Sequence, residues 1–121
     1  MYDWKAKLEE LRGAIELTDE QKNELALGVS WAMWKVNGSP VEDTRRAELS
    51  IRNQLERLIE AHWDGYGIWE VGRDEFSPHE STPYKAFVGV IGDFTRGEWG
   101  ATPTQALMDA LLSVVEEAPN A

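Results

Sequence analysis

Three helix-start signals constrain the fold of this chain more than any other feature. Each is a Ser or Thr followed three residues later by Gln or Glu, in "TDEQ" (18–21), "SPVE" (39–42) and "TPTQ" (102–105). In such a capping box the hydroxyl accepts from a free backbone N–H, and the Gln or Glu side chain reaches back to the N–H of the cap. Proline in second place of the last two boxes suits a first helical position. The sequence therefore predicts helices that begin within these boxes.

The spacing of apolar residues predicts four helices in all. A helix before the first box carries Trp4, Leu8, Leu11 and Ile15 at spacings of four, three and four. The second carries Leu25, Val29, Met33 and Val36, and the third runs to about Trp63 with Ile51, Leu55, Leu58, Ile59 and His62 on its core side. The last has a wide apolar face that predicts burial against a sheet: Leu107, Met108, Leu111, Leu112, Val114 and Val115.

The segment between the third and last helices predicts a short antiparallel sheet. Its strands are "YGIWEV" (66–71), "YKAFVGVIGDF" (84–94) and "EWGAT" (98–102), with a tight connection at "TRG" (95–97). In the second strand, Phe87 and Ile91 point one way, and Ala86, Val88 and Val90 the other. A strand that is apolar on both faces needs a layer on each. We predict one α+β domain, 1–121, with a helical part (1–64), a β-β-β-α part (65–121) and helices covering both sheet faces.

The stretch "AHWDGYGIWEVG" (61–72) resembles a small active site in composition. The structural interpretation is that Gly65 takes the left-handed conformation that ends a helix, with His62 in the last turn. The alternative is a small-ligand or metal-dependent enzyme built around His62, Asp64, Glu70 and His79. These hypotheses differ in whether the four side chains converge in a cleft.

The overall composition excludes several classes of function. The chain has 22 acidic and 12 basic residues, a net charge of −10, which argues against direct nucleic-acid binding. It has no cysteine, which excludes thiolate metal sites and fits the cytoplasm. No apolar run is long enough to span a membrane. The glycines in "VGVIGDFTRGEWG" lack the lysine of a phosphate-binding loop. We expect a cytoplasmic protein without a cofactor or a metal.

An acidic exterior favours a basic protein or nucleoprotein surface as the partner. The candidate contact residues are the carboxylates expected at one end of the sheet: Asp74, Glu75, Glu80, Asp93 and Glu98. The long loop Arg73–Pro83 is the segment most expected to be functional. Trp31 and Trp34 lie off the apolar stripe of the second helix, so they are either covered by another element or exposed as partner anchors. The flanks of this helix could also form a two-fold homodimer.

The C-terminal half, from about Tyr66 to Ala118, resembles two families of small proteins. The ending "GATPTQALMDALLSVVEE" resembles that of the phage ABA-sandwich domain, "TAPEAICRAAL", at Thr102, Pro103, Ala106, Leu107, Ala110 and Leu111. It is also similar to the "GDTPEEAL" helix start of HicB-type antitoxins, at Gly100, Thr102, Pro103, Ala106 and Leu107. The first 60 residues match neither family.

The resemblance to the phage family implies a non-enzymatic protein that inhibits a host system in the host cytoplasm, such as an anti-CRISPR or another anti-defence protein. In one version, its carboxylates imitate nucleic-acid phosphates. The second resemblance implies an antitoxin that binds a basic toxin.

Overall fold

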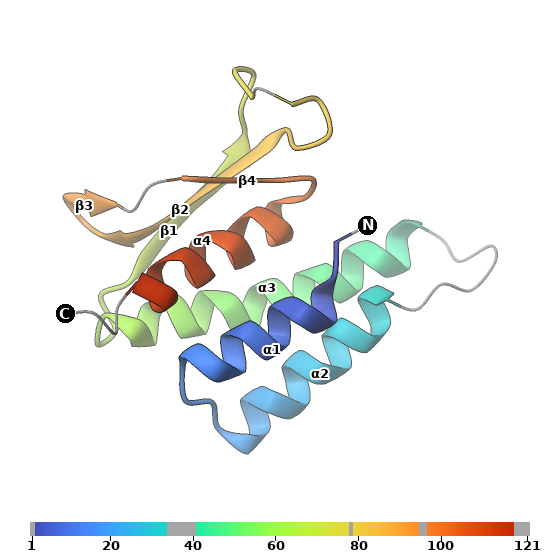
Figure 1. The fold of residues 1–121 in the computed structure, drawn as a ribbon, viewed down its shortest axis with the longest axis vertical. Helices are drawn as coiled ribbons and strands as arrows, with labels where there is room; N and C mark the ends of the chain where they lie inside the picture. Colours follow the sequence, from blue (N-terminus) through green and yellow to red (C-terminus); the bar gives the residue numbers. More distant parts are fainter. Residues whose placement is uncertain (1, 34–40, 78, 95–96, 118–121) are drawn as a thin grey trace. The chain divides into compact units, whose positions relative to one another are not determined.

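The computed structural model describes residues 2–33, 41–77, 79–94 and 97–117. In that part of the chain it contains α1 (Trp4–Ala14), α2 (Asp19–Met33), α3 (Val41–His62), β1 (Ile68–Arg73), β2 (Tyr84–Val90), β3 (Asp93–Phe94), β4 (Glu98–Gly100) and α4 (Pro103–Glu117) (Figure 1). Helices precede and follow an antiparallel sheet, which confirms the predicted α+β class. The chain divides into two compact units, Met1–Gln54 and Leu55–Ala121. The end of α3 thus belongs with the sheet, although the helical part was expected to reach residue 64. The single domain stays a prediction.

The first helix of the first unit buries the predicted face. Trp4, Leu8 and Leu11 are buried, and the Asp3 carboxylate caps the helix by accepting from the N–H of Ala6 at 3.1 Å. Ile15 follows the helix in extended backbone, so the predicted stripe is helical as far as Leu11.

The capping box that begins α2 is confirmed. The N–H of Thr18 donates to Gln21 Oε1 at 2.8 Å, and the N–H of Gln21 donates to Thr18 Oγ1 at 3.1 Å. On the predicted stripe Leu25 and Val29 are buried, whereas Val36 and the first two residues of the second box (39–40) lie outside the described residues.

A close contact joins α2 to α3 in this unit. A Cβ added to Gly28 would lie 2.8 Å from Cγ1 of Ile51. Because real Cβ atoms are not found so close, a larger residue at Gly28 would require the Ile51 side chain to move.

The end of α3 follows the predicted turn, with two corrections. The N–H of Gly65 donates to the carbonyl of Glu60 at 2.7 Å, and that of Asp64 donates to the carbonyl of Ala61 at 3.1 Å. This is the Schellman arrangement, and its left-handed residue is Asp64 (φ 54°), not Gly65. Gly65 is left-handed as well, as predicted (φ 89°). The predicted core position of His62 is wrong: it is exposed, because the helix ends there and the buried side stops at Ile59.

Gly67 leads into β1 and lies against the backbone of α3. A Cβ at Gly67 would meet the carbonyl carbon of Ile59 at 2.6 Å and Cα of Glu60 at 2.9 Å, and the carbonyl oxygen of Ile59 would be closer still. The end of α3 and the start of β1 can approach this closely only because position 67 has no side chain.

Strand β2 is the centre of the sheet. One edge of β2 pairs with all six residues of β1, from Arg73↔Tyr84 to Ile68↔Gly89. The other edge pairs with β3 near Val90 and with β4 from Tyr84 to Ala86, so the third strand position is filled by two short pieces.

The end of the predicted second strand is wrong. The chain turns back at Ile91 and Gly92, since Val90 already pairs with Asp93. Gly92 has a φ of 86°, a left-handed conformation that glycine adopts readily. A turn therefore falls there, before the predicted "TRG", whose first two residues lie outside the described part of the chain.

Helix α4 covers one face of the sheet (Figure 1) and contacts β1, β2 and β4. Its predicted N-cap is present, since Thr102 Oγ1 accepts from the N–H of Gln105 at 3.2 Å. Ala86 and Val88 are fully buried on the covered face. A Cβ on Gly100 would lie 2.5 Å from the backbone nitrogen of Ala106, so β4 and α4 are in close contact. The wide apolar face that was predicted is buried except at Val114, which is half-buried. The buried residues of α4 are Ala106, Leu107, Met108, Ala110, Leu111, Leu112 and Val115.

The opposite face of the sheet carries a lysine between two aromatic rings. Lys85 Nζ lies 4.6 Å from the ring centroid of Trp99 and 5.2 Å from that of Phe87. The predicted alternation along β2 holds, because Lys85 and Phe87 lie opposite the fully buried Ala86 and Val88. Helices were expected on both faces of the sheet, and α4 covers the first face. On the second face, the side chains of Lys85, Phe87 and Trp99 are partly exposed.

Candidate interaction surface

The loop between β1 and β2 contains three of the predicted contact residues, and one of them has a structural role. Asp74 is half-buried, and its Oδ1 accepts from the N–H of Phe76 at 2.8 Å. Its own N–H donates to the carbonyl of Pro83 at 2.8 Å, which closes the loop. Asp74 therefore shapes the loop, while the exposed side chains of Glu75 and Glu80 remain available for contact.

Ser77 organises the interior of the same loop. Its Oγ lies 2.7 Å from the carbonyl oxygen of Thr82 and 2.9 Å from that of His79, and it accepts from the N–H of His79 at 3.3 Å. The N–H of Thr82 donates to the carbonyl of His79 at 3.1 Å. This hydroxyl is engaged by the backbone, so its role in the loop is structural.

Phe76 projects from this loop with 89% of its surface exposed. Two hydrogen bonds hold the backbone around it, from its own N–H to Asp74 and from the N–H of Ser77 to the carbonyl of Asp74 at 3.2 Å. A large apolar side chain held in water by an ordered turn is a feature of protein interaction sites. Sequence reasoning missed Phe76. The available signal was a phenylalanine with no apolar neighbour inside a polar loop.

A groove of about 380 Å³ runs from Phe76 onto the face of the sheet that carries Lys85 and Phe87. Its lining combines aromatic rings, carboxylates and two basic groups: Glu70, Gly72, Arg73, Asp74, Glu75, Phe76, Lys85 and Phe87. A second hollow of about 590 Å³ includes Ser77, His79 and Glu80 and shares Arg73, Asp74 and Glu75 with the first. The loop therefore contributes to two neighbouring concave surfaces.

The remaining two predicted carboxylates do not both belong to this end of the sheet. Glu98 pairs with Ala86, close to the loop, and is half-buried. Asp93 pairs with Val90, at the far end of a seven-residue strand, roughly 20 Å from the loop at about 3.3 Å per residue. Asp93 is thus separate from the predicted cluster, because the chain turns at Gly92 and reverses before reaching it.

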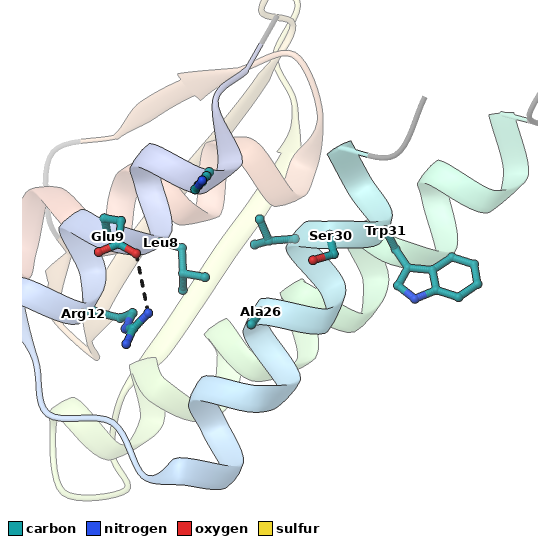
Figure 2. Close-up of a pocket in the computed structure, with 8 residues that line it drawn as sticks. Leu8, Glu9, Arg12, Ala26, Ser30 and Trp31 are labelled. Atoms are coloured by element: carbon teal, nitrogen blue, oxygen red, sulfur yellow. Dashed lines mark ion pairs between the residues drawn. The ribbon is translucent and has the colours of Figure 1, made fainter. Parts of the chain in front are cut away.

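The first unit contains the predicted aromatic anchor, Trp31, which is 51% exposed. It borders a groove of about 740 Å³ between α1 and α2 (Figure 2). On the α1 side of this groove, Arg12 pairs with Glu9 at 3.5 Å. A smaller groove of about 300 Å³ between α2 and α3 is lined by Leu27, Gly28, Trp31, Arg46, Ala47 and Ser50. Trp34, the second predicted anchor, lies outside the described residues.

The four residues of the enzyme alternative do not converge. His62 and Asp64 precede β1, Glu70 lies within that strand, and His79 is in the loop beyond it. A six-residue strand separates the two ends by roughly 17 Å. Among the described residues, no group of three or more His, Asp or Glu side chains is placed to hold a metal ion.

No helix in the described part of the chain has the length and apolar character to span a membrane. No family model, curated protein or solved structure matches this chain.

Proposed function

We propose that this chain is a non-enzymatic interaction protein that binds a basic protein or nucleoprotein surface through the β1–β2 loop and inhibits the partner by covering that surface. The observation that supports this best is Phe76, almost fully exposed on a loop ordered by its own hydrogen bonds. An aromatic residue at the centre, with polar groups around it, is the arrangement that dominates binding energy in many interfaces.

Charge supports a basic partner. Glu75 and Glu80 are exposed on the loop, and Glu70 is exposed on the adjoining strand. Arg73 and Lys85 line the same groove, but the net charge of −10 makes the long-range field of the chain negative. Such a field attracts a positive surface and speeds association, and salt weakens it. Asp74 contributes by holding Phe76 in place.

The resemblance of the C-terminal half supports a more specific form of this proposal. In that form the chain is a phage-type inhibitor of a host defence system, acting in the host cytoplasm, and its carboxylates occupy sites that the partner uses for nucleic-acid phosphates. An antitoxin that covers a basic toxin would use the same loop and the same charges.

The test compares two equally exposed apolar residues at opposite ends of the sheet. Phe76 is 89% exposed on the loop, and Ile91 is 88% exposed at the β2–β3 turn. The tagged chain captures partners from a bacterial lysate, mass spectrometry identifies them, and titration with the purified partner gives the affinity. Phe76→Ser should weaken binding by about 30-fold or more, as expected for loss of a central aromatic contact of about 2 kcal/mol. Ile91→Ser should leave binding unchanged.

Charge reversal tests the second part of the proposal. Glu75→Lys and Glu80→Lys should each slow association and reduce its dependence on salt, with thermal stability unchanged because both side chains are exposed. A partner that binds Phe76→Ser as tightly as the natural chain, or an affinity that does not change with salt, would show that another surface is used.

A further inference from the structure

The exposed surface of α2 is divided into an acidic half and an apolar half. Glu20, Glu24, Leu27 and Trp31 follow one another at spacings of four, three and four, which places them on one side of the helix. Both glutamates are exposed, and Leu27 and Trp31 are 58% and 51% exposed. Exposed large apolar residues one turn apart form a contiguous patch, which in soluble proteins marks a contact surface.

Beside this patch lies a groove that the same residues help to form. Leu27 and Trp31 make one wall of the hollow of about 300 Å³ between α2 and α3, and Ala47 and Ser50 make the other. Arg46 is the charged residue in its lining and is exposed. The exposed Leu27 and Trp31 side chains thus lie beside this groove. Glu20 and Glu24 lie at the N-terminal end of the patch, and Arg46 lies near its other end.

A surface of this kind is complementary to itself under a two-fold rotation. If two α2 helices lie antiparallel with Leu27 of each against Trp31 of the other, Glu24 lies about 4.5 Å beyond the partner's Trp31 along the axis, at 1.5 Å per residue. Ala47 lies beside Gly28, and α3 runs antiparallel to α2 (Figure 1), so Arg46 lies toward this same Trp31 end of the patch. Each copy then supplies one Glu24 and one Arg46, so the interface contains two pairs of opposite charge.

We propose that the occupant of this surface is a second copy of the chain, in a two-fold dimer centred on Leu27 and Trp31 with Glu24 of each copy facing Arg46 of the other. The proposal goes beyond the function proposed above and shares no residue with the β1–β2 loop. A two-fold rotation brings Glu24 of each copy next to Arg46 of the other. An unrelated apolar segment would gain nothing from opposite charges at the two ends of the patch, so the charges favour a second copy.

Sedimentation equilibrium of the full chain over a concentration series measures the dimer dissociation constant. Leu27→Glu should raise that constant by about 30-fold or more, since it places a charge at the centre of the interface. Ile91→Glu, at an exposed site in the other unit, should leave the dissociation constant unchanged. Circular dichroism of each variant shows that the fold is retained.

A charge exchange tests the orientation. Glu24→Arg and Arg46→Glu should each raise the dissociation constant by about tenfold, because each converts two attractive pairs into repulsive ones. The double variant should return it to within about threefold of the natural value, since the pairs are restored in reverse. A chain that is monomeric throughout, a dimer unaffected by Leu27→Glu, or a double variant no tighter than the singles would each overturn the proposal.

Discussion

Replacing Gly67 by alanine tests the contact that joins the end of α3 to the sheet. The new Cβ would lie 2.6 Å and 2.9 Å from backbone atoms of Ile59 and Glu60, and closer to the Ile59 carbonyl oxygen. All three atoms belong to the helix backbone, so no side-chain rotation can relieve the overlap, and β1 must move away from α3. Overpacking of this kind costs about 1–3 kcal/mol, and we expect a value near the upper end.

Urea unfolding measured by tryptophan fluorescence gives the change in free energy of unfolding. With a slope of about 1.5 kcal/mol per molar urea, a loss of about 3 kcal/mol lowers the midpoint by about 2 M. The matched control is Gly72→Ala in β1, where a Cβ meets no heavy atom within 4 Å. It should change stability by no more than about 0.5 kcal/mol, or raise it slightly by restricting the unfolded chain. Equal midpoints for the two variants would refute the argument that Gly67 is required by close approach.

Three further substitutions test local features of the fold by thermal or urea unfolding. Asp64→Gly should stabilise the chain by up to about 1 kcal/mol, because Asp64 has a left-handed backbone that glycine adopts without strain. An unchanged stability would mean that the Asp64 side chain stabilises the fold by as much as its backbone strain costs. Thr18→Ala should destabilise by about 1 kcal/mol, since it removes the acceptor for the N–H of Gln21; an unchanged midpoint would show the cap to be dispensable. Gly100→Ala should cost about 2 kcal/mol by displacing the start of α4 at Ala106; full stability would mean that the helix shifts freely.

Local chemistry made most of the fold predictable. The boxes at Thr18 and Thr102 depend on side chains within four residues, so sequence alone predicts where α2 and α4 begin. The turn at Gly92 was missed because glycines stand at both 92 and 97, and local signals do not show which one the sheet uses. The core position of His62 was wrong because periodicity continues past the residue at which a helix ends.

The candidate surface was less predictable, since it depends on loop geometry. The sequence indicated an acidic loop but not that Asp74 turns inward, because that follows from its hydrogen bond to Phe76. The sequence also did not predict that Phe76 is exposed, since a single aromatic residue in a loop can be either buried or exposed. Asp93 was grouped with the loop although the loop and Asp93 lie at opposite ends of β2; the predicted start of that strand, Tyr84, was right, and its predicted end was four residues too late.

The hydrogen bonds around Ser77 have a consequence for how the loop would meet a partner. The described part of the loop is ordered before any encounter, whereas ordering a flexible segment on binding costs about 1–2 kcal/mol per residue. Complex formation would then resemble the meeting of two preformed shapes, with its speed governed by orientation. Removing one hydroxyl, in Ser77→Ala, would reintroduce that entropic penalty while the exposed side chains of Phe76, Glu75 and Glu80 stay unchanged.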